Sequence, residues 1–169
     1  GGGMNLINSN PILSHVLISD NMVGMLSFGG GMYLQSSNPI LTHVTITNNT
    51  ANSGGGMYLC DYSNPTLTHV TITNNTSDFF GGGMHLWDYS NPTLTNVTIT
   101  NNTAGALGGG IHFEGSNSLL TNSIVWDNSP ESIYLTSDEE PIITYSDIEG
   151  GWEGEGNIDL DPLFTDPEN

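Results

Sequence analysis

The chain has 169 residues, enough for one domain with a hydrophobic core, and it contains 18 Asp and Glu but no Lys or Arg. The formal net charge of −18 disfavours nucleic acids and anionic membrane surfaces as partners, because both are bound through basic side chains. Divalent cations, Ca²⁺ above all, are the partners that this charge favours, although no cofactor is required by the sequence.

The first feature in chain order is a Gly-Gly-Gly triplet that recurs along the chain. The triplets begin at residues 1, 29, 54, 81 and 108, so the interval between them is 25 to 28 residues. Self-similarity at a fixed period of this length indicates a solenoid. Glycine at these points allows tight corners between the repeated elements.

Each triplet is followed by an apolar-polar-apolar segment, which predicts a strand. These segments are 4–6, 32–34, 57–59, 84–86 and 111–113. An Asn-Pro turn comes next in four repeats, and Asn117-Ser118 replaces it in the fifth. The turn leads into predicted strands over 40–47, 66–73 and 93–100, in which apolar and polar residues alternate as they do in half-buried strands.

Stacking of these repeats predicts an all-β fold, a right-handed single-stranded parallel β-helix (β-solenoid) of about five to six coils, each of 25–28 residues. Met or Ile after the glycines and Leu or Phe two residues later are expected to form two inward ladders. Each repeat closes on a polar pair whose Asn is expected to stack at a corner. The predicted ladder is Asn21, Asn49, Asn75, Asn102 and Asn128.

The repeat predicts two parts in the chain. Residues 1–128 form the β-helix coils, and residues 129–169 form acidic, irregular closing coils or a cap of the same solenoid. Within this tail, Asp159, Asp161 and Asp166 are weak candidates for Ca²⁺ binding, and a solvated acidic face is the alternative. The chain starts in mid-repeat and shows neither a signal peptide nor a transmembrane segment, so we expect a fragment of a longer protein.

The triplet followed by Met or Ile, together with the Ile-Thr-Asn-Asn close, resembles the bacterial right-handed β-helix repeat proteins of the pectate-lyase-like superfamily. The sequence is most similar to their non-catalytic surface type and to polymorphic outer-membrane passenger domains. This resemblance implies an extracellular or bacterial cell-surface location. It also implies that the chain is not an enzyme, since the lyases of this superfamily rely on Arg or Lys.

An aromatic and acidic patch is the main candidate site for a glycan or a cation. Asp61 and Asp88 follow equivalent Leu residues, so they should lie about 5 Å apart on adjacent coils. That spacing suits a shared Ca²⁺ and also resembles a retaining glycosidase pair, while a simple loop decoration is the alternative. The predicted patch, which we expected to face outward, is Tyr58, Asp61, Tyr62, His85, Trp87, Asp88, Tyr89 and His112.

Two further files of side chains have alternative interpretations. The Thr-x-Thr segments at 45–47, 71–73 and 98–100 resemble the arrays of ice-binding β-solenoids, but Thr is also a common exposed strand residue. Leu17 and Ser19 are expected below this array, with Ser123 and Val125 above it. A second file consists of His15, His43 and His69. Three imidazoles on adjacent coils could bind a transition metal, and the alternative is that they simply fill a polar corner of the coil.

The leading prediction is a structural or adhesive module of an extracellular or cell-surface protein that associates with copies of itself, end to end, into a fibre. The alternative is a carbohydrate-binding module that acts through the aromatic and acidic patch. A polysaccharide hydrolase and an ice-binding protein are further alternatives.

Overall fold

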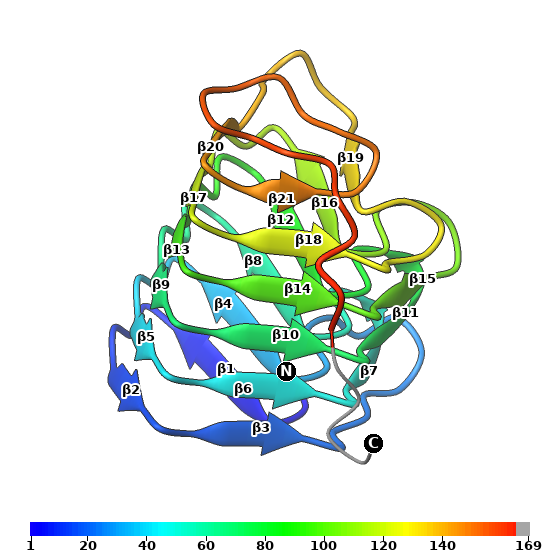
Figure 1. The fold of residues 1–169 in the computed structure, drawn as a ribbon. Helices are drawn as coiled ribbons and strands as arrows, with labels where there is room; N and C mark the ends of the chain where they lie inside the picture. The colour runs from blue at the N-terminus through cyan, green and yellow to red at the C-terminus, as the bar shows by residue number, and fades with distance from the viewer. Residues whose placement is uncertain (165–169) are drawn as a thin grey trace.

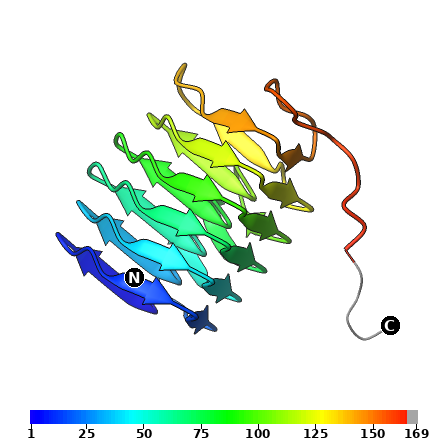
Figure 2. The ribbon, with the colours of Figure 1, turned by 60° about the vertical axis from the view of Figure 1, so that its left-hand side comes forward.

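The computed structural model describes residues 1–164, which form a parallel β-solenoid without helices (Figures 1 and 2). Three sheets, A, B and C, have six strands each, and a shorter sheet D has three. Every pairing is parallel and joins one coil to the next. The predicted all-β solenoid is therefore confirmed. None of the described residues belongs to a helix that is long and apolar enough to cross a membrane.

Each coil passes through the sheets in the same order. Sheet A contains β1 (Met4–Ile7), β4 (Met32–Gln35), β8 (Met57–Cys60), β12 (Met84–Trp87), β16 (Ile111–Glu114) and β19 (Ile133–Leu135). Sheet B contains β2 (Ile12–Ser14), β5 (Ile40–Thr42), β9 (Thr66–Thr68), β13 (Thr93–Thr95), β17 (Leu119–Thr121) and β20 (Ile142–Thr144). Sheet C contains β3 (Leu17–Ser19), β6 (Thr45–Thr47), β10 (Thr71–Thr73), β14 (Thr98–Thr100), β18 (Ile124–Trp126) and β21 (Asp147–Ile148). Sheet D contains β7 (Thr50–Ser53), β11 (Thr76–Phe80) and β15 (Thr103–Ala104).

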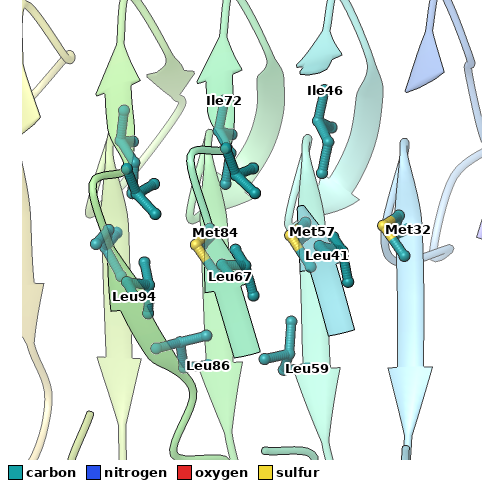
Figure 3. Packing of buried hydrophobic residues seen from close by; sticks show 14 of the residues in the cluster. Met32, Leu41, Ile46, Met57, Leu59, Leu67, Ile72, Met84, Leu86 and Leu94 are labelled. Atoms are coloured by element: carbon teal, nitrogen blue, oxygen red, sulfur yellow. The ribbon is translucent and has the colours of Figure 1, made fainter. Parts of the chain in front are cut away.

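The core consists of files of like residues that run along the solenoid axis (Figure 3). On sheet A, Met32, Met57 and Met84 are in register and fully buried. On sheet C, Ile46 and Ile72 are in register and likewise buried. The Met register, with the equivalent register of Leu34, Leu59 and Leu86, confirms the two ladders predicted after the glycines. Each file stacks one side chain on its equivalent in the next coil, so the core is continuous through the coils rather than divided among them.

The segments predicted as single strands over 40–47, 66–73 and 93–100 are each divided into two. The dividing residues, His43, His69 and Asn96, have φ angles of 53° to 55°, which is the left-handed region. The chain therefore turns a corner between sheets B and C at each of them. Sheet D was not predicted at all, because its strands are short and rich in Thr, Ser and Ala rather than alternating.

The glycine triplets bring the backbones of adjacent coils into close contact. The first glycine of the fourth triplet, Gly81, has a φ angle of 61°, and the chain reverses there toward sheet A. The second, Gly82, lies against backbone atoms of the next coil. A Cβ atom added to Gly82 would lie 2.5 Å from the carbonyl oxygen of Thr103 and 2.6 Å from that of Gly109. This corner requires glycine because backbone occupies the place of a side chain.

The acidic segment after residue 128 continues the sheets and then folds over the last coil. β19, β20 and β21 add a sixth strand to sheets A, B and C. Trp152 packs against the core, and the Asn157 side chain donates to the carbonyl oxygens of Ile143 and Trp152 at 2.8 and 3.3 Å. These contacts cover the apolar end that the last coil would otherwise expose.

Candidate functional site

A ladder of buried asparagines lies where sheet C ends. The amide nitrogen of Asn75 donates to the side-chain oxygen of Asn102 and to the carbonyl oxygen of Ile46, both at 3.0 Å. The side-chain oxygen of Asn75 accepts from the amide nitrogen and the backbone N–H of Asn49. The same pattern links the members Asn21, Asn49, Asn75, Asn102 and Asn128. This ladder satisfies buried backbone groups, and we assign it a structural role.

The patch that was predicted to face outward is in fact divided between two places. Tyr58, His85 and His112 are only 6%, 4% and 2% exposed, so the prediction of a continuous outward patch is wrong for these three residues. They point outward from sheet A, but other side chains cover them. The remaining members lie at the turn between sheets A and B, where Trp87, Tyr62 and Tyr89 are exposed.

Phe28 and Phe80 cover the outer face of sheet A. Each lies just before a glycine triplet, and its ring stacks on a residue from the sheet A strand of the next coil. The Phe28 ring stacks on Tyr58 with 4.7 Å between centroids, and the Phe80 ring stacks on His112 with 5.1 Å between centroids. Besides the hydrophobic core inside the coils, an aromatic cluster therefore lies on the outer face of sheet A. Neither phenylalanine was recognised from the sequence, because both lie in the segment whose length varies between repeats.

The buried part of the patch brings together His85, His112 and Glu114. The Nε2 atom of His85 lies 3.3 Å from Oε2 of Glu114, and the two imidazole centroids are 4.7 Å apart. Burial, and then the neighbouring His85, lower the pKa of His112 to about 4, so this imidazole is neutral at neutral pH. The hydrogen bond with His85 lowers the pKa of Glu114, which favours the carboxylate.

Glu114 was missed in the sequence, although its place in the repeat points to it. It pairs with Trp87 of the preceding coil, one position after the Leu86–Phe113 pair. An alignment of the repeats by their glycines would therefore have placed Glu114 close to His85 and His112.

The exposed part of the patch is built on two turns that are longer than the others. Between the last inward residue of sheet A and the buried serine that follows, the third and fourth coils each have one extra residue. The extra residues are Tyr62 and Tyr89, which are 62% and 53% exposed. Their rings stack with 5.5 Å between centroids and 13° between planes. The two long turns therefore project a pair of parallel aromatic rings.

These turns also hold an unusual backbone conformation. Asp61 and Tyr62 have φ angles of 53° and 60°, and Asp88 and Tyr89 have φ angles of 54° and 56°. Other corners, such as that at His43, use a single left-handed residue, whereas each of these longer turns uses two in succession. Of the two carboxylates in these turns, that of Asp61 accepts a hydrogen bond from the Gln35 side chain at 2.6 Å.

Buried serines restore the register directly after the long turns. The backbone N–H of Ser37 donates to the hydroxyl oxygen of Ser63, and that of Ser63 donates to the hydroxyl oxygen of Ser90, both at 3.1 Å. The turn preceding Ser37 is one residue shorter than the turns preceding Ser63 and Ser90. The extra residues are therefore accommodated within the turns, and the core files on either side do not shift.

The file of His15, His43 and His69 lies on the exposed corner between sheets B and C. Adjacent rings are parallel, with centroids 4.9 Å apart. Asn96 continues the file with the same left-handed backbone and donates to Nε2 of His69 at 3.2 Å. Asn and His both fill this corner, which favours the interpretation as a polar turn.

The threonine files on sheet C extend over three coils, and apolar residues end them except at Ser19, which pairs with Thr47 as expected. The register places Leu17 before Thr45, and Ile124 and Trp126 after Thr98 and Thr100. The expectation that Ser123 and Val125 would follow is wrong by one residue, because Val125 pairs with the inward Ile99. The threonine surface that an ice-binding protein would use is therefore only three coils long in this structure.

The acidic candidates in the tail do not converge in the described residues. Asp159 accepts from the backbone N–H of Gly150 at 3.3 Å, and Asp161 accepts from that of Leu163 at 2.9 Å. Asp166 lies outside the described residues. In residues 1–164 the group of three side chains with the residue types and spacing of a metal site is His85, His112 and Glu114.

Comparison with known families agrees with this architecture. The model of the family described as right-handed beta helix region matches residues 68–154, just over half of the chain. The chain therefore belongs to this family of parallel β-helices. Comparisons with curated proteins and with solved structures found no match.

Proposed function

We propose that this protein is a non-catalytic adhesive module of an extracellular or cell-surface protein, and that it binds neutral carbohydrate through the turns of its third and fourth coils. The observation that carries the proposal is the stacked pair of Tyr62 and Tyr89 on the two longer turns. The binding surface consists of this pair with Trp87, Asp61 and Asp88, and we refer to it as the tyrosine turn surface.

The chemistry of the tyrosine turn surface suits a sugar ligand. Exposed aromatic rings offer flat apolar faces, while the carboxylates of Asp61 and Asp88 accept hydrogen bonds from hydroxyl groups. The net charge of −18 repels acidic polysaccharides, so the ligand class is neutral. The resemblance of the repeat to non-catalytic surface β-helix proteins supports the adhesive role. The absence of Lys and Arg from the chain is a reason to propose binding rather than catalysis.

The double variant Tyr62→Gly, Tyr89→Gly is expected to lose at least about tenfold in affinity for its neutral glycan, because it removes both stacking faces. Its free energy of unfolding is expected to change by less than about 1 kcal/mol, since glycine relieves the left-handed strain while the contact between the rings is lost. A glycan array identifies the ligand, and isothermal titration calorimetry then measures the affinity of each variant.

Tyr145→Gly is the matched control. Tyr145 is 51% exposed and has a φ angle of 52°, but it lies on the corner between sheets B and C. Its replacement should leave glycan affinity unchanged. Equal losses in both variants, or no binding to any neutral glycan, would contradict the proposal. Turnover of a neutral polysaccharide that disappears in Asp61→Ala would instead support a hydrolase. End-to-end association into a fibre stays a prediction, which electron microscopy of the purified chain tests.

A further inference from the structure

We propose that His85, His112 and Glu114 form a zinc site on the outer face of β12 and β16, distinct from the tyrosine turn surface. One ligand atom from each of these side chains lies within 4.8 Å of the other two. Two imidazoles and one carboxylate are a common protein ligand set for Zn²⁺, whereas Ca²⁺ takes oxygen ligands. We call this cluster the histidine–glutamate site.

The separations are close to those of a bound tetrahedral ion. With metal–ligand distances near 2.0–2.1 Å, ligand atoms around zinc lie about 3.4 Å apart. The Nε2 atom of His85 and Oε2 of Glu114 already lie 3.3 Å apart. All separations are within 4.8 Å, so the widest must shorten by at most about 1.4 Å to reach that geometry. The Glu114 carboxylate can adjust its position because its side chain is 42% exposed.

The nitrogens that face the polar groups of the cluster are the Nε2 atoms, which lie beside Glu114 in His85 and beside Thr136 in His112. The Nδ1 atoms are buried and have no hydrogen-bond partner among the described residues. Each neutral imidazole can carry its proton on Nδ1, which leaves a lone pair on Nε2 for the metal. The rings are also held in place, since His85 and His112 are 4% and 2% exposed and Phe80 packs against both.

The surroundings favour a cation and allow it to enter. The chain has no Lys or Arg that could pair with Glu114, and its net charge is −18. Glu114 and Thr136 lie at the solvent edge of the cluster, and the Thr136 hydroxyl is 2.6 Å from Nε2 of His112. Three protein ligands leave coordination positions for water on this side, as open zinc sites do.

The test uses the full chain after treatment with a chelator. Isothermal titration calorimetry with Zn²⁺ is expected to give one site per chain, and Co²⁺ is expected to give the visible absorption bands of a tetrahedral complex. Glu114→Gln and His85→Phe should each weaken Zn²⁺ binding at least about tenfold. Glu114→Gln keeps the shape of an exposed side chain, so circular dichroism should show an intact fold.

The exposed histidine file provides the matched control. In the triple variant His15→Asn, His43→Asn, His69→Asn, each histidine is replaced by the residue that the chain itself uses at Asn96, with the same left-handed backbone. Zn²⁺ affinity should be unchanged in this variant. Loss of binding in the triple variant would assign the metal to the exposed file and overturn the proposal. Binding that is absent from the native chain, or equal in all variants, would also overturn it.

Discussion

The Gly82→Ala variant is expected to lose about 3 to 5 kcal/mol of its free energy of unfolding, which is at the upper end for a single substitution. The added methyl group would lie 2.5 Å from the carbonyl oxygen of Thr103 and 2.6 Å from that of Gly109. Both atoms are backbone, so no rotation of a side chain relieves the overlap. Separation of the coils would break the hydrogen bond from the N–H of Gly82 to the carbonyl oxygen of Gly108.

Gly24→Ala is the matched control for this substitution. Gly24 lies in an exposed loop, and a Cβ atom added there would meet nothing within 4 Å. Its replacement is expected to leave stability unchanged or to raise it by about 0.5 kcal/mol, because alanine restricts the unfolded chain. Urea denaturation followed by circular dichroism measures both variants. If the two variants unfold at the same urea concentration, the claim that backbone contacts at Gly82 exclude a side chain is wrong.

Asn75→Ala is expected to destabilise the protein by about 3 to 5 kcal/mol, because it leaves several buried groups without partners. The Asn75 side chain is fully buried and makes hydrogen bonds with Asn49, Asn102 and the carbonyl oxygen of Ile46. Alanine provides neither the donor nor the acceptor. The same urea titration measures the effect.

Asn74→Gly is the matched control, because Asn74 is the residue next to Asn75 in the sequence but is not a member of the buried ladder. Asn74 is exposed, and its φ angle of 55° suits glycine. Its replacement is expected to change the free energy of unfolding by less than about 0.5 kcal/mol. Equal effects at Asn74 and Asn75 would show that the polar pair acts through the turn rather than through the buried ladder.

The coil and its inward ladders could be predicted because each repeat carries the same local signals. Alternation such as Val70-Thr71-Ile72-Thr73 sets which side chains face inward, and the glycine triplets set the length of the coil. Stacking of equivalent positions then follows from the repeat alone. The corner at His69 does leave a signal, because the inward residues Leu67 and Val70 are three positions apart rather than two, but so short a break is easily read as part of one strand.

The cover over sheet A could not be predicted in the same way. Phe28 and Phe80 lie in the part of the repeat where length and composition vary, and the equivalent residues of adjacent coils are Ser53 and Leu107 rather than aromatic residues. Their contacts with Tyr58 and His112 depend on how the chain reverses at the glycines. For this reason the histidines appeared to be surface residues, and the histidine–glutamate site emerged only in three dimensions.

The serine contacts after the long turns have a consequence for how such a molecule diversifies. Because Ser63 and Ser90 return the chain to a common register, a residue gained before them changes the outer surface of one coil and leaves the packing of its neighbours intact. Insertions at this point are therefore close to neutral for folding while they alter what the surface presents. Selection can act on each coil separately, and the outer surface can change without a change in the interior.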